Sequence, residues 1–188
     1  MSTVVMEQRK KIHPHKFTLW VGIGSLLMMF AGLTSAYIVK RNQVNWQSFD
    51  LPPFFWYSTV VIGLSSGTIY LALKAFRQRE MKRYRNMLLA TLLLGVLFLV
   101  FQLLGFQQLW QKEIKLTGNV SHSFMYVIVS MHAAHVLGGI IALLVLYAKA
   151  YGKKTRIYNS IPVELVSTYW HFVDVLWIYL LLFLIMIR

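Results

Sequence analysis

The sequence predicts an all-α membrane protein, built as one bundle of five transmembrane helices. Of its 188 residues, 57% are hydrophobic and only six carry a side-chain carboxylate. Several apolar runs exceed the length of about 18 residues that marks a membrane-spanning helix. A soluble domain of this size would not contain such runs, so we expect a polytopic membrane protein.

The five expected helices follow one another with short polar connections. The first comes after a basic tail, residues 1–16, and its apolar run exceeds the core of about 7–15 residues in a secretory signal peptide, so we expect an uncleaved span. Pro52 and Pro53 open the second helix, since proline suits a first helical turn, and a dense basic loop, residues 74–85, follows it. The expected spans are residues 17–39, 52–76, 86–110, 121–148 and 162–187. No internal repeat or low-complexity linker is visible, so residues 17–188 are expected to form one domain.

The basic residues predict the orientation of the bundle. The amino-terminal tail and the second and fourth loops carry 14 lysine and arginine residues, whereas the opposite side carries 5. Short loops rich in these residues stay in the cytoplasm. We therefore expect the amino terminus in the cytoplasm and the carboxyl terminus outside.

Charge and cysteine content exclude several classes of function. A net charge of +13 would suggest nucleic-acid binding in a soluble protein, but here the charges lie in loops between spans. Membrane orientation accounts for them, so no nucleic-acid partner is expected. The lack of cysteine excludes disulfides, haem attached through thiols and thiolate metal sites.

Ionisable side chains in the last helix are the first candidate functional residues. Glu164, His171 and Asp174 lie among aromatic residues in an otherwise apolar helix. Each such group near the middle of a membrane helix costs roughly 2.5–3.5 kcal/mol on insertion scales. A helix that accepts this cost more than once is expected to hide these groups against a neighbouring helix.

The fourth span carries a second set of candidates. His132 and His135 are three residues apart, which places both rings on one side of the helix. Gly138 and Gly139 follow one turn later, and small residues let a neighbouring helix approach closely. We therefore expect helix packing at the two glycines.

The depths of these residues suggest a pairing between the last two helices. At about 1.5 Å per residue, Asp174 lies roughly 18 Å from Pro162, and His135 lies roughly 20 Å from Ala148 on the same side. A hydrogen bond or ion pair between His135 and Asp174 is therefore a hypothesis. Replacing Asp174 with asparagine should then destabilise the helix pair, and unchanged assembly and heat stability would contradict it.

Three uses of these side chains stay open at this point. Buried polar residues in membrane bundles are often only inter-helix contacts, worth around 0.6 kcal/mol on average. A metal or haem site would use the imidazoles as ligands. A proton relay or a lipid site would use the same set of residues.

Two motifs give the chain a specific resemblance. The element WHFVDVLW, preceded by Glu164 and Tyr169, and the element HAAHVLGG in the preceding helix resemble the signature of subunit III of haem–copper oxidases, the cytochrome c oxidase subunit 3 family. The resemblance covers essentially residues 17–188 and points to a five-helix bacterial form without the first two of seven helices. The matching positions are His132, His135, Gly138, Glu164, Trp170, His171, Phe172, Asp174 and Trp177.

The resemblance implies a non-catalytic subunit in the bacterial inner membrane. In that family subunit III has no haem or copper, which belong to subunits I and II. It packs against subunit I, holds phospholipids in a cleft and supports proton uptake. We therefore expect no catalytic residue, metal ligand or cofactor in this chain, and a structural, lipid-associated role for the matching positions. The expected partners are subunits I and II and phospholipids, with subunit IV and a respiratory supercomplex as further candidates.

One position departs from the family pattern. The first shared helix usually has a buried glutamate after a serine, and that carboxylate is the target of carboxylate reagents. In the stretch GSLLMMFAGLTSAY, Ser25 is present but Leu26 replaces the glutamate. No role of that carboxylate carries over to this chain.

The leading interpretation is subunit III of a proton-pumping cytochrome c oxidase of the aa3 or caa3 type, in aerobic respiratory electron transport. Subunit III of a quinol oxidase and the related subunit of nitric oxide reductase share the fold, and this sequence separates them poorly. A stand-alone transporter or a haem-b protein belongs to another class. The sequence has neither the inverted repeat nor the broken helices of many transporters.

Overall fold

The structure, a computed structural model, describes residues 14–41, 53–111, 120–151 and 160–187. Its elements are five helices: α1 (Pro14–Arg41), α2 (Phe54–Arg77), α3 (Met81–Gln111), α4 (Val120–Tyr151) and α5 (Ile161–Ile187). Each is long and apolar enough to cross a membrane. The prediction of an all-α protein with five membrane-spanning helices is therefore confirmed.

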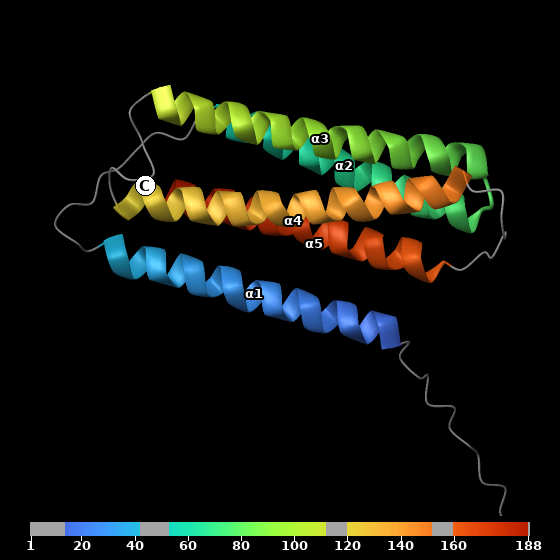
Figure 1. Ribbon diagram of the computed structural model, residues 1–188, viewed down its shortest axis with the longest axis horizontal. Coiled ribbons are helices and arrows are strands. Elements are labelled where there is room, and N and C mark those ends of the chain that lie inside the picture. The colour runs from blue at the N-terminus through green and yellow to red at the C-terminus, as the bar shows by residue number, and fades with distance from the viewer. Residues whose placement is uncertain (1–13, 42–52, 112–119, 152–159, 188) are drawn as a thin grey trace, which may run out of the picture.

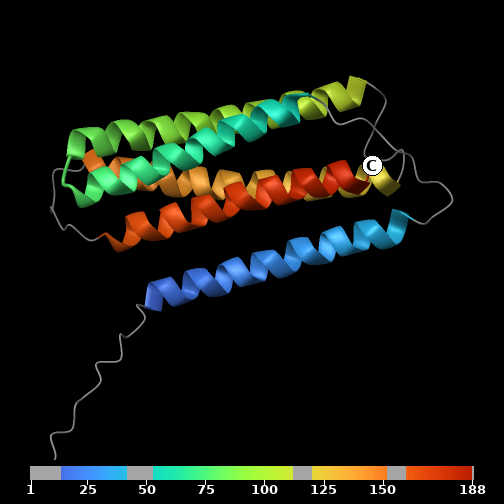
Figure 2. The same cartoon turned by 180° about the vertical axis from the view of Figure 1, so that it is seen from behind.

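Helices α2 to α5 form a closed ring, and α1 lies outside it (Figures 1 and 2). Around the ring α2 packs on α3, α3 on α4, α4 on α5, and α5 on α2. Among the described residues α1 contacts only α4 and α5. The architecture is thus a four-helix bundle with a fifth helix laid against one seam.

The connection between α2 and α3 is much shorter than the basic loop expected over residues 74–85. Helix α2 ends at Arg77 and α3 begins at Met81. Arg79 has φ 60°, and its N–H donates to the carbonyl of Phe76, while the N–H of Glu80 donates to that of Ala75. This Schellman arrangement ends α2 and allows a three-residue turn. The expected loop was wrong because hydropathy marks the apolar part of a helix, whereas basic residues can continue it past the membrane core.

The interior of the ring is filled by large aromatic and branched side chains. Trp170, Trp177, Phe55, Phe98 and Ile62 are all almost completely buried. The outward faces carry exposed apolar side chains on every helix, such as Met28 on α1 and Met186 on α5. Exposed apolar faces of this kind suit contact with lipid or with other membrane helices.

Helix α1 is attached to α5 and α4 by a few specific contacts. The Thr34 hydroxyl lies 3.2 Å from the Tyr179 hydroxyl on α5. One turn further along both helices, the Tyr37 ring meets the edge of Phe183 at 5.6 Å between ring centroids. Phe30 is buried against His135 of α4, with 5.8 Å between the ring centroids. These contacts cover only one side of α1.

Candidate functional site

Trp170 of α5 contacts every other helix of the ring. Its indole lies against two glycines on two different helices. A methyl group at Gly95 of α3 would lie 2.8 Å from Cη2 of Trp170, and one at Gly139 of α4 would lie 2.9 Å from Cζ3. On the third neighbouring helix, Ser65 of α2 accepts a hydrogen bond from the indole Nε1 at 2.6 Å. One tryptophan of the WHFVDVLW element therefore contacts all three other helices of the ring.

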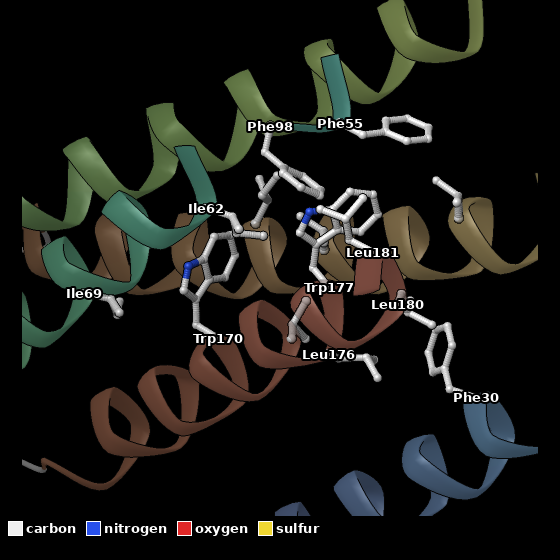
Figure 3. Close-up of a cluster of buried hydrophobic side chains, with 14 of the residues drawn as sticks. Phe30, Phe55, Ile62, Ile69, Phe98, Trp170, Leu176, Trp177, Leu180 and Leu181 are labelled. Carbon is white, nitrogen blue, oxygen red and sulfur yellow. The ribbon is translucent and has the colours of Figure 1, made fainter. Parts of the chain in front are cut away.

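Trp177 occupies the next layer of the interior, two turns further along α5 (Figure 3). Its Nε1 donates to the hydroxyl of Thr59 on α2 at 2.9 Å. The indole also meets the edges of Phe55 and Phe98, with ring centroids 5.8 and 5.3 Å apart, and lies 5.2 Å from the His132 ring. Both tryptophans thus hydrogen-bond to α2 while packing on α3 and α4.

The hydroxyl side chains of α2 are the site residues that sequence reasoning missed. Ser65 and Thr59 accept from the two tryptophans, and Ser66 pairs with His171. Next to Thr59, Ser58 accepts from Nε2 of Gln102 on α3 at 3.1 Å. The signal was present as two pairs with seven-residue spacing, Ser58 with Ser65 and Thr59 with Ser66, matching the seven residues between the tryptophans.

His171 and Asp174 point towards α2 rather than α4. Nδ1 of His171 lies 2.6 Å from the Ser66 hydroxyl. The same hydroxyl lies next to Asp174. Asp174 is 3% exposed, and neither carboxyl oxygen has hydrogen-bond geometry with any residue that the structure describes. The carboxyl is therefore buried beside one hydroxyl and without a cation.

The two histidines of α4 face different surroundings. His132 is fully buried, and neither ring nitrogen has a hydrogen-bond partner in the described part of the chain. His135 is half-buried, and its Nδ1 donates to the carbonyl of Met131 at 2.6 Å. The carbonyl of His135 accepts from the Tyr169 hydroxyl at 3.0 Å.

The hypothesis of a hydrogen bond or ion pair between His135 and Asp174 is therefore wrong. Residues three apart on a helix differ by about 60° in direction. That angle is enough to turn His132 into the ring and His135 towards α1. Asp174 in turn faces α2. The rise per residue gives the depth of a side chain in the membrane, but not the direction in which it points around the helix.

Glu164 lies apart from these residues, at the end of the bundle where α5 begins. Its carboxylate pairs with Lys16 of α1 at 2.9 Å and with Arg77 of α2 at 3.2 Å. The Lys16 and Arg77 side chains are 45% and 61% exposed, so each pair is worth only about 0.2–1 kcal/mol. The structure thus divides the expected polar cluster into three places: the Glu164 pairs, the α2–α5 seam and the interior around His132.

The two glycines of α4 also differ. Gly139 is buried against Trp170, whereas Gly138 is exposed and a methyl group there would meet only the Tyr169 hydroxyl, at 4.0 Å. Phe172 is partly buried against the core. Of the two glycines, Gly139 is therefore the one that lets a side chain of α5 approach α4.

A cleft of about 820 Å³ lies between α1 and α5 near the end where α1 begins. It is lined by Pro14, His15, Thr18, Leu19, Gly22, Ile23, Ser25, Leu26, Leu165 and Tyr169. Leu26, at the position where the resemblance implies a glutamate, is one of the side chains that line it. Its lining is mostly apolar, which suits a hydrocarbon chain better than a charged ligand.

The absence of a carboxylate in α1 leads to a labelling prediction. Residues 14–41 contain no aspartate or glutamate. We expect a hydrophobic carbodiimide, applied to the protein in its membrane, to leave peptides from α1 unmodified when they are analysed by mass spectrometry. A modified carboxyl peptide from residues 17–39 would contradict this, and a Leu26→Glu variant is the matched positive control.

The site offers contacts between helices rather than a ligand set for a metal. Within residues 14–41, 53–111, 120–151 and 160–187, no three histidine, aspartate or glutamate side chains come together as a metal site requires. The hydrogen bonds of Trp170, His171 and Trp177, and the one between the Tyr169 hydroxyl and the His135 carbonyl, instead connect one helix to another. The arrangement fixes the packing of α5 against α2, α3 and α4.

Comparison with known proteins shows which family this chain is similar to. A model of the family described as cytochrome c oxidase subunit III matches residues 44–187. Cytochrome c oxidase subunit 3 of Bacillus sp. strain PS3 is 26% identical over 166 residues, covering 86% of this chain and 80% of the relative. That of Corynebacterium diphtheriae is 31% identical over 159 residues, covering 81% and 78%. Subunit 3 of the cytochrome bo(3) ubiquinol oxidase of Buchnera aphidicola is 27% identical over 169 residues, covering 86% and 81%.

The family match covers α2 to α5, the ring in which Trp170 and Trp177 are seated, and it includes both motifs that the sequence resemblance rested on. The relatives also align over most of their own length. This chain is therefore a member of the cytochrome c oxidase subunit III family.

Proposed function

We propose that this chain is the non-catalytic subunit III of a proton-pumping cytochrome c oxidase of the aa3 or caa3 type, where it stabilises subunit I and supports proton uptake. The observation that carries the proposal is the use of the WHFVDVLW element. Its two tryptophans and His171 are engaged in contacts between helices, and the described residues hold no metal ligand set. The redox chemistry is thus assigned to haem and copper in partner subunits I and II.

Cytochrome c is the proposed electron donor of the complex. The relatives from Bacillus and Corynebacterium are named for cytochrome c oxidases, which supports this choice. The relative from Buchnera belongs to a ubiquinol oxidase, so a quinol donor is the second candidate. The donor would be recognised by another subunit, and a neighbouring subunit II gene with a copper-binding cysteine motif would favour cytochrome c.

The complex is proposed to lie in the bacterial inner membrane with the α2–α3 turn in the cytoplasm. The charge bias of the sequence supports this orientation, because lysine and arginine concentrate at that end. The chain has no cysteine, so Gln78→Cys and Gln111→Cys variants each carry one thiol at opposite ends of the bundle. A membrane-impermeant maleimide should label Gln111→Cys in intact spheroplasts and Gln78→Cys only after permeabilisation. The reverse pattern would invert the proposed topology.

The cleft between α1 and α5 is the proposed place for a bound phospholipid. Its volume of about 820 Å³ and its mostly apolar lining suit an acyl chain. Lys16 and Arg77 lie at the same end of α5, through their ion pairs with Glu164, and would attract an acidic head group. We also infer that residues 17–188 act as one membrane unit.

Affinity purification of the tagged chain tests the proposed function. In mild detergent we expect it to bring down a haem-containing oxidase core with a Soret absorbance band and phospholipid that organic solvent extracts. The isolated chain should show no Soret band. A haem spectrum from the isolated chain would favour a haem-b protein, and recovery without any haem partner would contradict the subunit III proposal.

A further inference from the structure

Asp174 differs from the other carboxyl groups of the described chain in its surroundings. It lies thirteen residues into α5, roughly 20 Å from the start of that helix, and therefore near the middle of the membrane. Glu80 lies in the turn between α2 and α3, and Glu164 lies in the first turn of α5; both pair with basic side chains. Neither oxygen of Asp174 has a donor among the described residues.

An ionised carboxylate fits this position poorly. It accepts up to about four hydrogen bonds and donates none. Burying it in a membrane bundle without donors or a cation costs several kcal/mol. A protonated carboxyl, in contrast, needs only one acceptor for its O–H. The Ser66 hydroxyl lies beside it on α2 and has lone pairs to offer.

The position of His171 allows one direction of the hydrogen bonds that leaves all three groups uncharged. Ser66 has one proton to donate, and its oxygen lies 2.6 Å from Nδ1 of His171. When Ser66 donates to Nδ1, its lone pairs are left to accept from Asp174. The imidazole then carries its proton on Nε2, and His171 as a residue is only partly buried. Every proton in the three groups has a place, and no group is charged.

The surrounding helices bring no charge to this seam. The other titratable and charged groups on the two helices that form it are Tyr57, Tyr70, Lys74 and Arg77 on α2, and Glu164, Tyr169 and Tyr179 on α5. Of these, Tyr70 lies one turn from Ser66 and carries no charge at neutral pH. His132 of α4 packs on Trp177 and Phe98, and His135 packs on Phe30. In the described ranges no cationic side chain forms an ion pair with Asp174.

We propose that Asp174, Ser66 and His171 form a proton-holding site in the middle of the membrane. In this site Asp174 keeps its proton and, after a small rotation of its carboxyl group, donates it to the adjacent Ser66, which donates in turn to Nδ1 of His171. The alternative is an aspartate–imidazolium pair. It arises when the Asp174 proton moves to Ser66 as the Ser66 proton moves to Nδ1, so that Ser66 is unchanged. The site therefore stores one dissociable proton, which either Asp174 or His171 can hold.

Infrared difference spectroscopy of the purified full-length chain at neutral pH tests the proposal. A protonated carboxyl absorbs apart from carboxylate and from the amide bands. We expect the wild type to show this band and Asp174→Asn to lose the intensity of one carboxyl per chain. Ser66→Ala should move the band to higher frequency, because the carboxyl loses its hydrogen-bond partner. Loss of carboxylate intensity in Asp174→Asn, or an unmoved band in Ser66→Ala, would overturn the proposal.

Glu164→Gln is the matched control. It removes a carboxyl from the same helix, but one that is ion-paired, so it should lower carboxylate intensity and leave the acid band intact. If Asp174→Asn does not fold, the wild type labelled with ¹³C in the aspartate carboxyl answers the question, because the chain has only two aspartates, Asp50 and Asp174. A labelled acid band supports the site, and its absence at neutral pH overturns it.

Discussion

Truncation of Trp170 to alanine is expected to cost about 3–5 kcal/mol of stability, the largest effect of any single substitution considered for this chain. The indole is 1% exposed and fills the space between Gly95, Gly139 and Ser65 on three helices. Glycine has no side chain with which to refill the cavity. We expect a strong fall in the thermal midpoint of the purified protein in detergent and a loss of subunit from the complex.

Two variants separate packing from general effects of losing a tryptophan. Trp170→Phe keeps most of the ring volume but removes the Nε1 donor to Ser65, so an intermediate loss is expected. Trp110→Ala removes a tryptophan that is 59% exposed at the end of α3 and should change the midpoint little. Equal effects of Trp170→Ala and Trp110→Ala would show that the indole does not hold the ring together.

Gly139→Ala is expected to destabilise the protein, whereas Gly138→Ala is not. A methyl group at Gly139 would lie 2.9 Å from Trp170, whose other edge is already held by Gly95. The indole has no free side to move to, so overpacking of this kind costs about 1–3 kcal/mol. Thermal unfolding followed by circular dichroism measures the loss.

Gly138 is the control, because it is also a glycine and lies at nearly the same depth in α4. A methyl group at Gly138 has no neighbour closer than 4.0 Å, and alanine is favoured over glycine in a helix by about 1 kcal/mol. Gly138→Ala should therefore be neutral or slightly stabilising. Similar destabilisation by both variants would mean that backbone flexibility, not contact with Trp170, explains the glycine pair.

The sequence was sufficient for the number of helices and their order, because a membrane requires long apolar runs and few alternatives fit. It was less accurate at the ends, where the basic residues from Lys74 to Arg85 continue two helices instead of forming a loop. Hydropathy marks the part of a helix inside the membrane core, and it does not show where the last hydrogen-bonded turn of the helix ends.

The candidate site was predicted in composition but not in arrangement. The motif residues on α4 and α5 were found because ionisable and glycine residues are rare inside spans. Their partners on α2 were missed, since Ser65 and Ser66 are unremarkable in a membrane helix until the tryptophan donors are placed against them.

The ring of α2 to α5 closes without α1, and the part of the chain that matches the family model begins at residue 44, after α1 ends. The relatives align further than this family model, because the 166 residues aligned with the Bacillus subunit exceed the stretch from residue 44 to the end and so include part of α1. Since α1 packs only on the outside of α4 and α5 among the described residues, the ring that seats Trp170 is closed by α2 to α5 alone.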